Sequence, residues 1–445
     1  MAAQRKLRVA WFSALDFDGE TRSLSAYVST LLLPLLSQSF EIELFCDSFG
    51  RYQEFPTHHY LTAYKRHAEC PFDLFFYQLE DCKCADFVRI HLGLIPGIVW
   101  FHDFALRTDG PEQILGSPWQ ETVAKFEAIS KPDSKPPRGT EFFRESPLAL
   151  REASYAAVAL FSNPAAHAQY RQSVKLSLRA ADTPSFYLPF PVQFFGGTAA
   201  NRNGVGRIIF CGSTGLEGRA HKVLEALAGF GTGVKLYWLL DAEERGRAEA
   251  LVRECEASQV EILEGRTPKR WQSLAAHADL AIHSHFSVFG GLGPYLEISL
   301  ANGVPCVVTD RVTDFAAADY LPEHLVMRVS PGRSEALELK ALLRAALSQE
   351  ICIDREQIRS FALETFDHRV VALELGQVFE RETPQLKSLM ENWRLLEQEA
   401  SLALIEEVGA SSATSSTISS ANEVAAAFDP WQQVYQPVFK ELGWK

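Results

Sequence analysis

The stretch from His283 to Asp310 constrains the fold more than any other part of the chain. It begins at the end of a short apolar run and passes through a glycine-rich turn at residues 290–293. A helix is expected from Tyr295 to about Asn302, and a second apolar run at residues 304–309 follows it directly. Strand, glycine-rich loop, helix and strand in this order predict a unit that binds phosphates or nucleotides.

Four residues of this stretch are candidates for contact with a ligand. Gly291 and Gly293 would let the backbone approach a bound group closely, because glycine has no β-carbon. Glu297 lies in the first helical turn, where a carboxylate suits the hydroxyls of a ribose and equally suits the positive end of the helix dipole. His285 is a further candidate, although a histidine at a loop mouth also often packs or lies on the surface.

The length, composition and net charge of the chain limit the number of domains and the classes of function. A chain of 445 residues holds about two domains at roughly 100–200 residues each. Hydrophobic residues make up 47% of it, which is enough for a large core. The net charge of −13 argues against broad binding to nucleic acid or to anionic lipid.

Cysteine usage and the absence of long apolar windows predict the compartment. Eight cysteines scattered along a long chain predict reduced thiols in a cytosolic protein. Cys82 and Cys84 have no second pair at zinc-site spacing, so no metal site is expected. The first apolar run is too short for a signal peptide, and no window offers the roughly 18 residues of a membrane span. We therefore expect a cytoplasmic protein, with peripheral attachment to a membrane left open.

Apolar runs alternate with helical or polar segments over residues 1–195. Such alternation predicts a doubly wound α/β domain, and the runs lie at residues 7–14, 41–46, 73–78, 97–101 and 158–162. His102 and Asp103 come directly after the fourth run. Ligands of open α/β sheets bind outside the carboxyl ends of the strands, so both are candidates, with a simple turn cap as an equal alternative.

Two polar segments divide the chain. Residues 108–147 are rich in Pro, Lys, Ser and Gly and predict an inserted loop in the first domain. Residues 196–206 are rich in Gly, Asn and Thr and predict a linker. A second strand–helix alternation over residues 207–380 predicts another Rossmann-like domain.

The C-terminal part, residues 381–445, is expected to lie outside the two domains. A helix is expected over residues 381–408 and a flexible polar linker over residues 409–427. Residues 428–445 are rich in aromatic side chains, which would be costly to leave in water. We expect this last segment to dock on the body of the protein or on a partner protein.

Several motifs resemble those of GT-B glycosyltransferases, most closely the bacterial group with the family 4, or group 1, type of C-terminal domain. Residues 292–297 (LGPYLE) and 301–308 (ANGVPCVV) are similar to the nucleotide-sugar segment of that family. Residues 210–222, a strand, a glycine loop and Lys222, are similar to its diphosphate site. Residues 96–103 (PGIVWFHD) resemble its acceptor-side motif.

The resemblance covers residues 7 to about 380 and implies the GT-B fold, two Rossmann-like domains facing a central cleft. It implies a hexosyltransferase that moves a sugar from a UDP- or GDP-linked donor to a glycan, lipid-linked or protein acceptor, as in polysaccharide biosynthesis. It implies a site without metal or cofactor, and a C-terminal helix that packs back on the first domain. Gly19 lies where the family has its first glycine-rich loop.

A metal-free site must neutralise two phosphates with cations and backbone amides. Gly212 and Ser213 are the candidate backbone donors, and Lys222 or Arg266 the candidate cations. An inverting reaction also needs a general base near the acceptor hydroxyl. Asp18, Asp103 and His102 are the candidates for it.

The chain departs from the family at Phe289, where the family has the first Glu of its Glu-x7-Glu motif. That Glu normally lies by the sugar ring, so retaining chemistry stays open against inverting chemistry. Two other classes also remain. One is a catalytically inactive GT-B subunit that binds or stabilises a glycosylation partner, and the other is a sugar-nucleotide epimerase.

Overall fold

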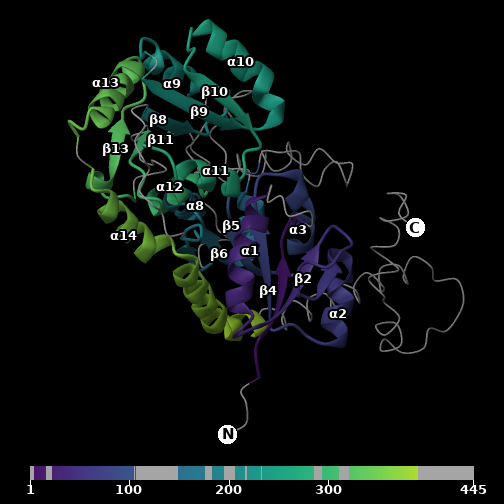
Figure 1. The fold of residues 1–445 in the computed structure, drawn as a ribbon. Coiled ribbons are helices and arrows are strands. Elements are labelled where there is room, and N and C mark those ends of the chain that lie inside the picture. The colour runs from purple at the N-terminus through teal and green to yellow at the C-terminus, as the bar shows by residue number, and fades with distance from the viewer. Residues whose placement is uncertain are drawn as a thin grey trace, which may run out of the picture.

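Two parallel β-sheets organise the chain, and helices cover both faces of each (Figure 1). This confirms the α/β architecture expected from the alternating apolar runs. The structure is a computed structural model, and it describes residues 5–16, 23–104, 106, 149–175, 183–194, 206–215, 218–231, 233–284, 293–309, 320–351 and 353–388. The predicted loop at residues 108–147, the linker at 196–205 and residues 389–445 lie outside these ranges.

The first sheet has the strand order β3-β2-β1-β4-β5-β6-β7. Its strands are β1 (Arg8–Phe12), β2 (Glu41–Cys46), β3 (Thr57–His59), β4 (Leu74–Leu79), β5 (Gly97–Phe101), β6 (Ala156–Phe161) and β7 (Ser185–Tyr187). Every residue of β1, β4 and β5 is buried, because these strands have neighbours on both edges and helices on both faces.

The helices of the first half are α1 (Leu24–Leu36), α2 (Ala63–Glu69), α3 (Asp86–Leu92), α7 (Leu150–Tyr155) and α8 (Pro164–Lys175). Helix α1 begins directly after Ser23, because the Ser23 hydroxyl accepts a hydrogen bond of 2.8 Å from the Ala26 amide. Sequence reasoning missed β3, α2 and α3.

The second sheet has the order β10-β9-β8-β11-β12-β13. Its strands are β8 (Gly206–Phe210), β9 (Val234–Leu240), β10 (Val260–Glu264), β11 (Leu280–His283), β12 (Cys306–Thr309) and β13 (Val326–Val329). Its helices are α9 (Ala220–Leu227), α10 (Arg245–Glu254), α11 (Pro268–Ala275), α12 (Tyr295–Ala301), α13 (Glu335–Leu347) and α14 (Arg355–Phe366). None of the described helices combines the length and the apolar character that crossing a bilayer requires.

The chain has two halves, the first built on the first sheet and the second on the second sheet. Residues 368–388 form a helix that returns from the second half to the first (Figure 1). The Phe379 ring packs edge-on against Phe40 and Phe76, with ring centroids 5.5 and 5.2 Å apart. Lys387 Nζ lies 2.8 Å from Asp73 Oδ1. The crossing therefore starts near Asp367, earlier than the helix that the sequence predicts from residue 381.

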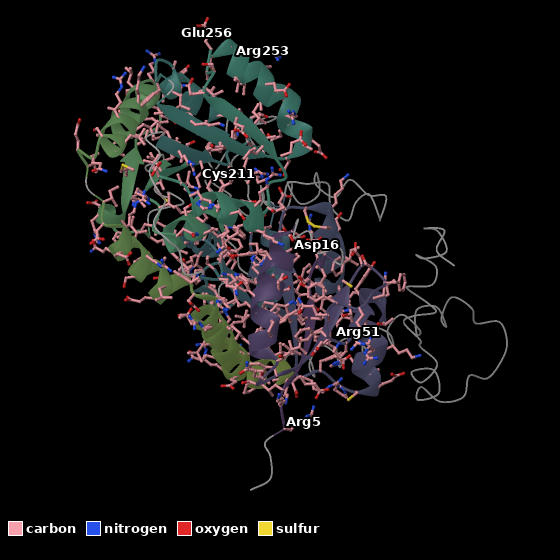
Figure 2. All side chains as sticks on the ribbon, viewed as in Figure 1. Arg5, Asp16, Arg51, Cys211, Arg253 and Glu256 are labelled. Carbon is pink, nitrogen blue, oxygen red and sulfur yellow. A yellow bond between two sulfur atoms is a disulfide. The ribbon has the colours of Figure 1, made fainter. Side chains whose placement is uncertain are left out.

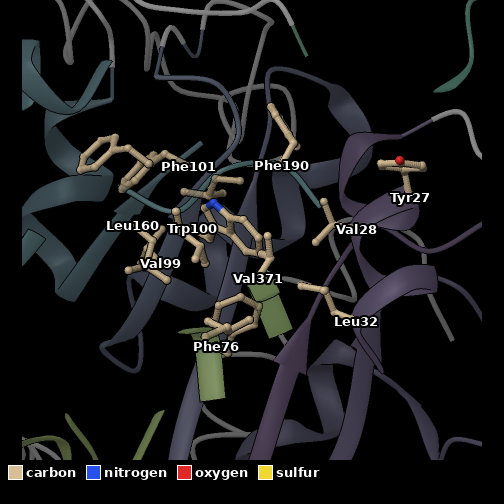
Figure 3. Close-up of a cluster of buried hydrophobic side chains, with 14 of the residues drawn as sticks. Tyr27, Val28, Leu32, Phe76, Val99, Trp100, Phe101, Leu160, Phe190 and Val371 are labelled. Atoms are coloured by element: carbon tan, nitrogen blue, oxygen red, sulfur yellow. The ribbon is translucent and has the colours of Figure 1, made fainter. Parts of the chain in front are cut away.

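One hydrophobic core connects the first sheet, the returning helix and one face of the second sheet. Figure 3 shows Val371 of the returning helix near Phe76 and Trp100 of the first sheet. Trp271 and Leu296 of the second half belong to the same cluster. The two sheets are thus held together by continuous apolar packing.

Cys82 and Cys84 form a disulfide just after β4, drawn as a yellow bond in Figure 2. The expectation of reduced thiols is wrong for these two residues, because the turn after β4 brings two side chains with one intervening residue into bonding contact. Cys46, Cys70, Cys211, Cys255 and Cys306 are free.

We expect the Cys82–Cys84 bond to be detectable by alkylation of the unreduced protein. Cys70, which is exposed, should react with N-ethylmaleimide, whereas Cys82 and Cys84 should react only after reduction. The peptide that carries both should be lighter by the mass of the lost thiol hydrogens. Labelling of both cysteines without a reductant would contradict the bond.

Candidate functional site

The carboxyl ends of both sheets face the boundary between the two halves. Figure 2 labels Asp16, after β1, and Cys211, after β8, near this boundary. In each sheet the strand order reverses next to the first strand, between β1 and β4 and between β8 and β11. Ligands of doubly wound sheets bind at such switch points, so the candidate site lies here.

Glu297 of α12 is the most informative side chain at the boundary. It is 4% exposed, and its Oε1 accepts a hydrogen bond of 2.9 Å from the Tyr320 hydroxyl. Its Oε2 has no hydrogen-bond partner among the described residues. Burial raises the pKa of the carboxyl to about 7, well above its ordinary 4.5. A buried carboxylate with a free oxygen can accept hydrogen bonds from a ligand's hydroxyls.

Further unpartnered polar atoms lie at the carboxyl ends of β11 and β12. Ser284 Oγ and Thr309 Oγ1 are buried without a partner in the described part of the chain. His283 packs beneath α12, with its Nε2 3.1 Å from Ser299 Oγ, and its Nδ1 also lacks a described partner. The strands are paired in register here, so these atoms lie on neighbouring strands at one sheet edge.

The loop after β8 is tight, and the Thr214 amide within it is already engaged. A β-carbon at Gly212 would overlap the Phe210 ring, and one at Gly218 would overlap Ser213, so both positions require glycine. The Thr214 amide and hydroxyl both donate to Glu244 Oε1, at 2.8 and 2.9 Å. A carboxylate thus holds the loop where the resemblance implies a diphosphate.

The two candidate cations differ in their surroundings. Lys222 Nζ lies 2.7 Å from Glu225 Oε2 on the same helix, α9. Arg266 Nη2 lies 2.7 Å from Asp241 Oδ2, and the Tyr295 hydroxyl of α12 donates to the Arg266 carbonyl oxygen. Arg266 also acts electrostatically on Asp103 of the first half. Arg266 is therefore the cation that the structure associates with both halves.

His102 lies inside the first half with both ring nitrogens engaged. Its Nε2 is 2.7 Å from Gln78 Oε1 and its Nδ1 is 3.0 Å from Ser162 Oγ. Burial lowers its pKa to about 3, so the ring is neutral at physiological pH. These contacts favour a structural role over the catalytic role that the motif suggests.

Asp103 has the properties of a proton acceptor near neutral pH. Burial, followed by the nearby carboxylates of Asp81 and Glu80, raises its pKa to about 7. Its Oδ2 accepts a hydrogen bond of 3.1 Å from the Asp81 amide. Of the two candidate bases in the described part of the chain, Asp103 and His102, Asp103 is the one whose pKa responds to the charge of Arg266 in the other half.

Glu80 is a site residue that sequence reasoning missed. It follows β4 and accepts hydrogen bonds from the Leu24 and Ser25 amides at the start of α1, at 2.8 and 3.2 Å. The free amides of that helix end therefore already hold an anion. In the described part of the chain, Glu80, Cys82 and Cys84 are the group whose atoms are close enough to hold a metal, and the disulfide removes its two thiolates.

Several predicted residues lie outside the described ranges. They are Asp18, Gly19, His285, Phe289 and Gly291. Gly293 is described and has a positive φ of 56°, which glycine adopts without strain. The structure thus brings Gly293, Glu297, Arg266 and Asp103 to the boundary.

Replacing Asp103 by Asn should flatten the dependence of stability on pH. The carboxyl has a higher pKa in the folded chain than its ordinary 3.8, so its contribution is present at low pH and lost as the pH rises from about 4 to about 7. Chemical denaturation at several pH values measures this. Asp47→Asn, at an exposed position, serves as the control. An unchanged slope in Asp103→Asn would contradict the raised pKa.

The chain is similar to known proteins in structure and not in sequence. No known family profile and no curated protein matches the sequence. Among solved structures, a sucrose-phosphate synthase from Thermosynechococcus elongatus superposes with a TM-score of 0.60 at 14% identity, covering 84% of this chain and 99% of that one. A glycosyltransferase from Rickettsia africae gives 0.58 at 8% identity, covering 85% and 99%.

Anabaena HepE, solved in complex with UDP and glucose, gives a TM-score of 0.55 at 13% identity, covering 84% of this chain and 100% of that one. At such identities the likeness shows the fold, and it covers 84–85% of this chain. The chain has the GT-B fold, the two-domain architecture of these glycosyltransferases.

Proposed function

We propose that the chain is a glycosyltransferase that binds a nucleotide-diphosphate sugar in its second half and transfers the sugar to an acceptor held by the first. The observation that carries the proposal is Glu297, a buried carboxylate with an unpartnered oxygen at the boundary of a GT-B fold. HepE, of the same fold, was solved with UDP and glucose. The acceptor classes are a glycan, a lipid-linked glycan or a protein.

Three residues, Glu297, Arg266 and Asp103, each have one task in this proposal. Glu297 accepts hydrogen bonds from two neighbouring hydroxyls of the donor, a geometry that carboxylates suit. Arg266 neutralises charge on the diphosphate, which a reaction independent of metal requires. Asp103 takes the proton of the acceptor hydroxyl, because its raised pKa lets it exchange protons near neutral pH. Retaining or inverting stereochemistry follows from where the acceptor binds.

A second candidate function is a catalytically inactive GT-B subunit that binds or stabilises a glycosylation partner. The positions of two carboxylates favour the inactive subunit. Glu80 holds the start of α1, and Glu244 holds the loop after β8. Lys222 is likewise paired with Glu225. Each of these contacts competes with a phosphate.

Calorimetry of the full chain with UDP, GDP and their glucose and mannose conjugates tests the proposal. We expect one nucleotide to bind in the micromolar range. Arg266→Ala should weaken it about tenfold, since hydrogen bonds to charged groups contribute about 1.5–3 kcal/mol. Lys222→Ala should weaken it less than about threefold if the pair with Glu225 is its main contact.

Lys235→Ala, which removes an exposed ion pair with Glu261, controls for the loss of any positive charge. Equal effects of the Arg266 and Lys222 variants would instead support both cations at the diphosphate. Binding of a nucleotide sugar without hydrolysis or transfer would favour the inactive subunit. Binding of none of these ligands at about 1 mM would overturn the donor site altogether.

A further inference from the structure

Three tyrosines, drawn from both halves of the chain, lie near Glu297. Tyr320 donates to its Oε1, and the Tyr187 ring of β7 lies 5.9 Å from the Tyr320 ring, centroid to centroid. Tyr27 of α1 lies close enough for the Glu297 charge to act on its hydroxyl, and the same holds for Tyr187. Tyr27 and Tyr187 belong to the first half, whereas Glu297 and Tyr320 belong to the second.

The hydroxyl oxygens of Tyr27 and Tyr187 are buried, and neither has a hydrogen-bond partner among the described residues. The same is true of Glu297 Oε2, and Glu297 and Tyr27 are 4% and 7% exposed. A buried polar group without a partner costs about 1–3 kcal/mol. Two such hydroxyls near a carboxylate that itself has an unpartnered oxygen would be expensive in a purely structural interface, where phenylalanines would pack as well.

We propose that Tyr27 and Tyr187 read the hydroxyls of the same ring that Glu297 binds. A vicinal diol offers two donors and several acceptors. A carboxylate oxygen accepts, whereas a phenol can both donate and accept, so together they match a diol on two sides. The ligand class is a diol-bearing ring of the donor, either its ribose or its sugar. This inference rests on the proposed function and deepens it.

The consequence is that donor recognition is divided between the halves. A ring held by Glu297 from α12 and by Tyr27 from α1 would bridge the boundary. The first half would then select the donor as well as the acceptor. Donor affinity would depend on residues outside the second Rossmann-like domain.

Tyr27→Phe and Tyr187→Phe test the proposal, because each removes one oxygen and keeps the ring. Calorimetry would use the nucleoside diphosphate that the unmodified chain binds and its sugar conjugate. Each variant should lose about fivefold in affinity, the effect of one hydrogen bond of about 1 kcal/mol. A loss on the nucleoside diphosphate itself assigns the ribose, and a loss confined to the conjugate assigns the sugar.

Tyr170→Phe is the matched control, since this buried tyrosine packs on Phe161 and Phe104 in the first half. A melting curve of each variant checks that it folds. If both ligands bind both Phe variants as tightly as the unmodified chain, while Glu297→Gln lowers binding, this inference falls and the proposed function stands. If no ligand binds the unmodified chain, the proposed function falls, and this inference with it.

Discussion

Glu297→Gln should weaken nucleotide binding by about ten- to a hundredfold. The amide keeps the size of the side chain but loses the charge that accepts both hydrogen bonds, and hydrogen bonds to charged groups contribute about 1.5–3 kcal/mol. Isothermal calorimetry at pH 8, above the raised pKa of about 7, gives the clearest contrast because the carboxyl is then ionised. At pH 5 the difference should shrink, since the carboxyl of the unmodified chain is then protonated.

The same variant should be more stable than the unmodified chain when no ligand is present. A carboxyl whose pKa is raised by burial loses stability as the pH rises from about 4.5 to about 7, and an amide does not titrate. The gain at pH 8 is of order 3 kcal/mol from the size of the shift. Glu350→Gln, at an exposed position, is the control. Unchanged affinity together with unchanged stability would show that Glu297 is neither buried nor used.

Phe379→Ala should lower the free energy of unfolding by about 3–5 kcal/mol, the range for removing a buried aromatic side chain. Phe379 is fully buried between Phe40 and Phe76, so its loss leaves a cavity between the returning helix and the first sheet. Urea denaturation followed by circular dichroism measures the change.

Leu373→Ala on the same helix is the matched control. This leucine is 64% exposed, so its replacement should change stability by less than about 0.5 kcal/mol. Similar losses in both variants would mean that the helix is sensitive to any change, and would contradict specific packing by Phe379.

The strands were predictable where burial on both faces leaves a continuous apolar run. Residues 41–46 and 97–101 form strands with the predicted bounds. Strand β3 and helix α2 were not predictable, because residues 57–69 mix His, Tyr and charged side chains and show no clear apolar period. The helical segment over residues 355–388 is divided at Asp367, whose backbone pairs with Val192 instead, and nothing in the sequence indicates this break.

The site was predictable only where it is local in the sequence. Glu297 and Gly293 were predicted from one strand–loop–helix motif. Tyr27, Tyr187 and Glu80 reach the boundary from distant segments, and no spacing in the sequence connects them to Glu297. The structural place of His102 was also hidden, because its partners Gln78 and Ser162 come from neighbouring strands.

The returning helix has a consequence for how the chain is made. The ribosome synthesises residues 5–194 first. The core of that half is completed by three residues that are among the last described ones to emerge, Val371, Leu375 and Phe379. Until then the apolar face under the returning helix, including Phe40 and Phe76, has no cover from it. During synthesis the first half is therefore the later one to reach its final stability, and its newly made form is the one that a chaperone would need to protect.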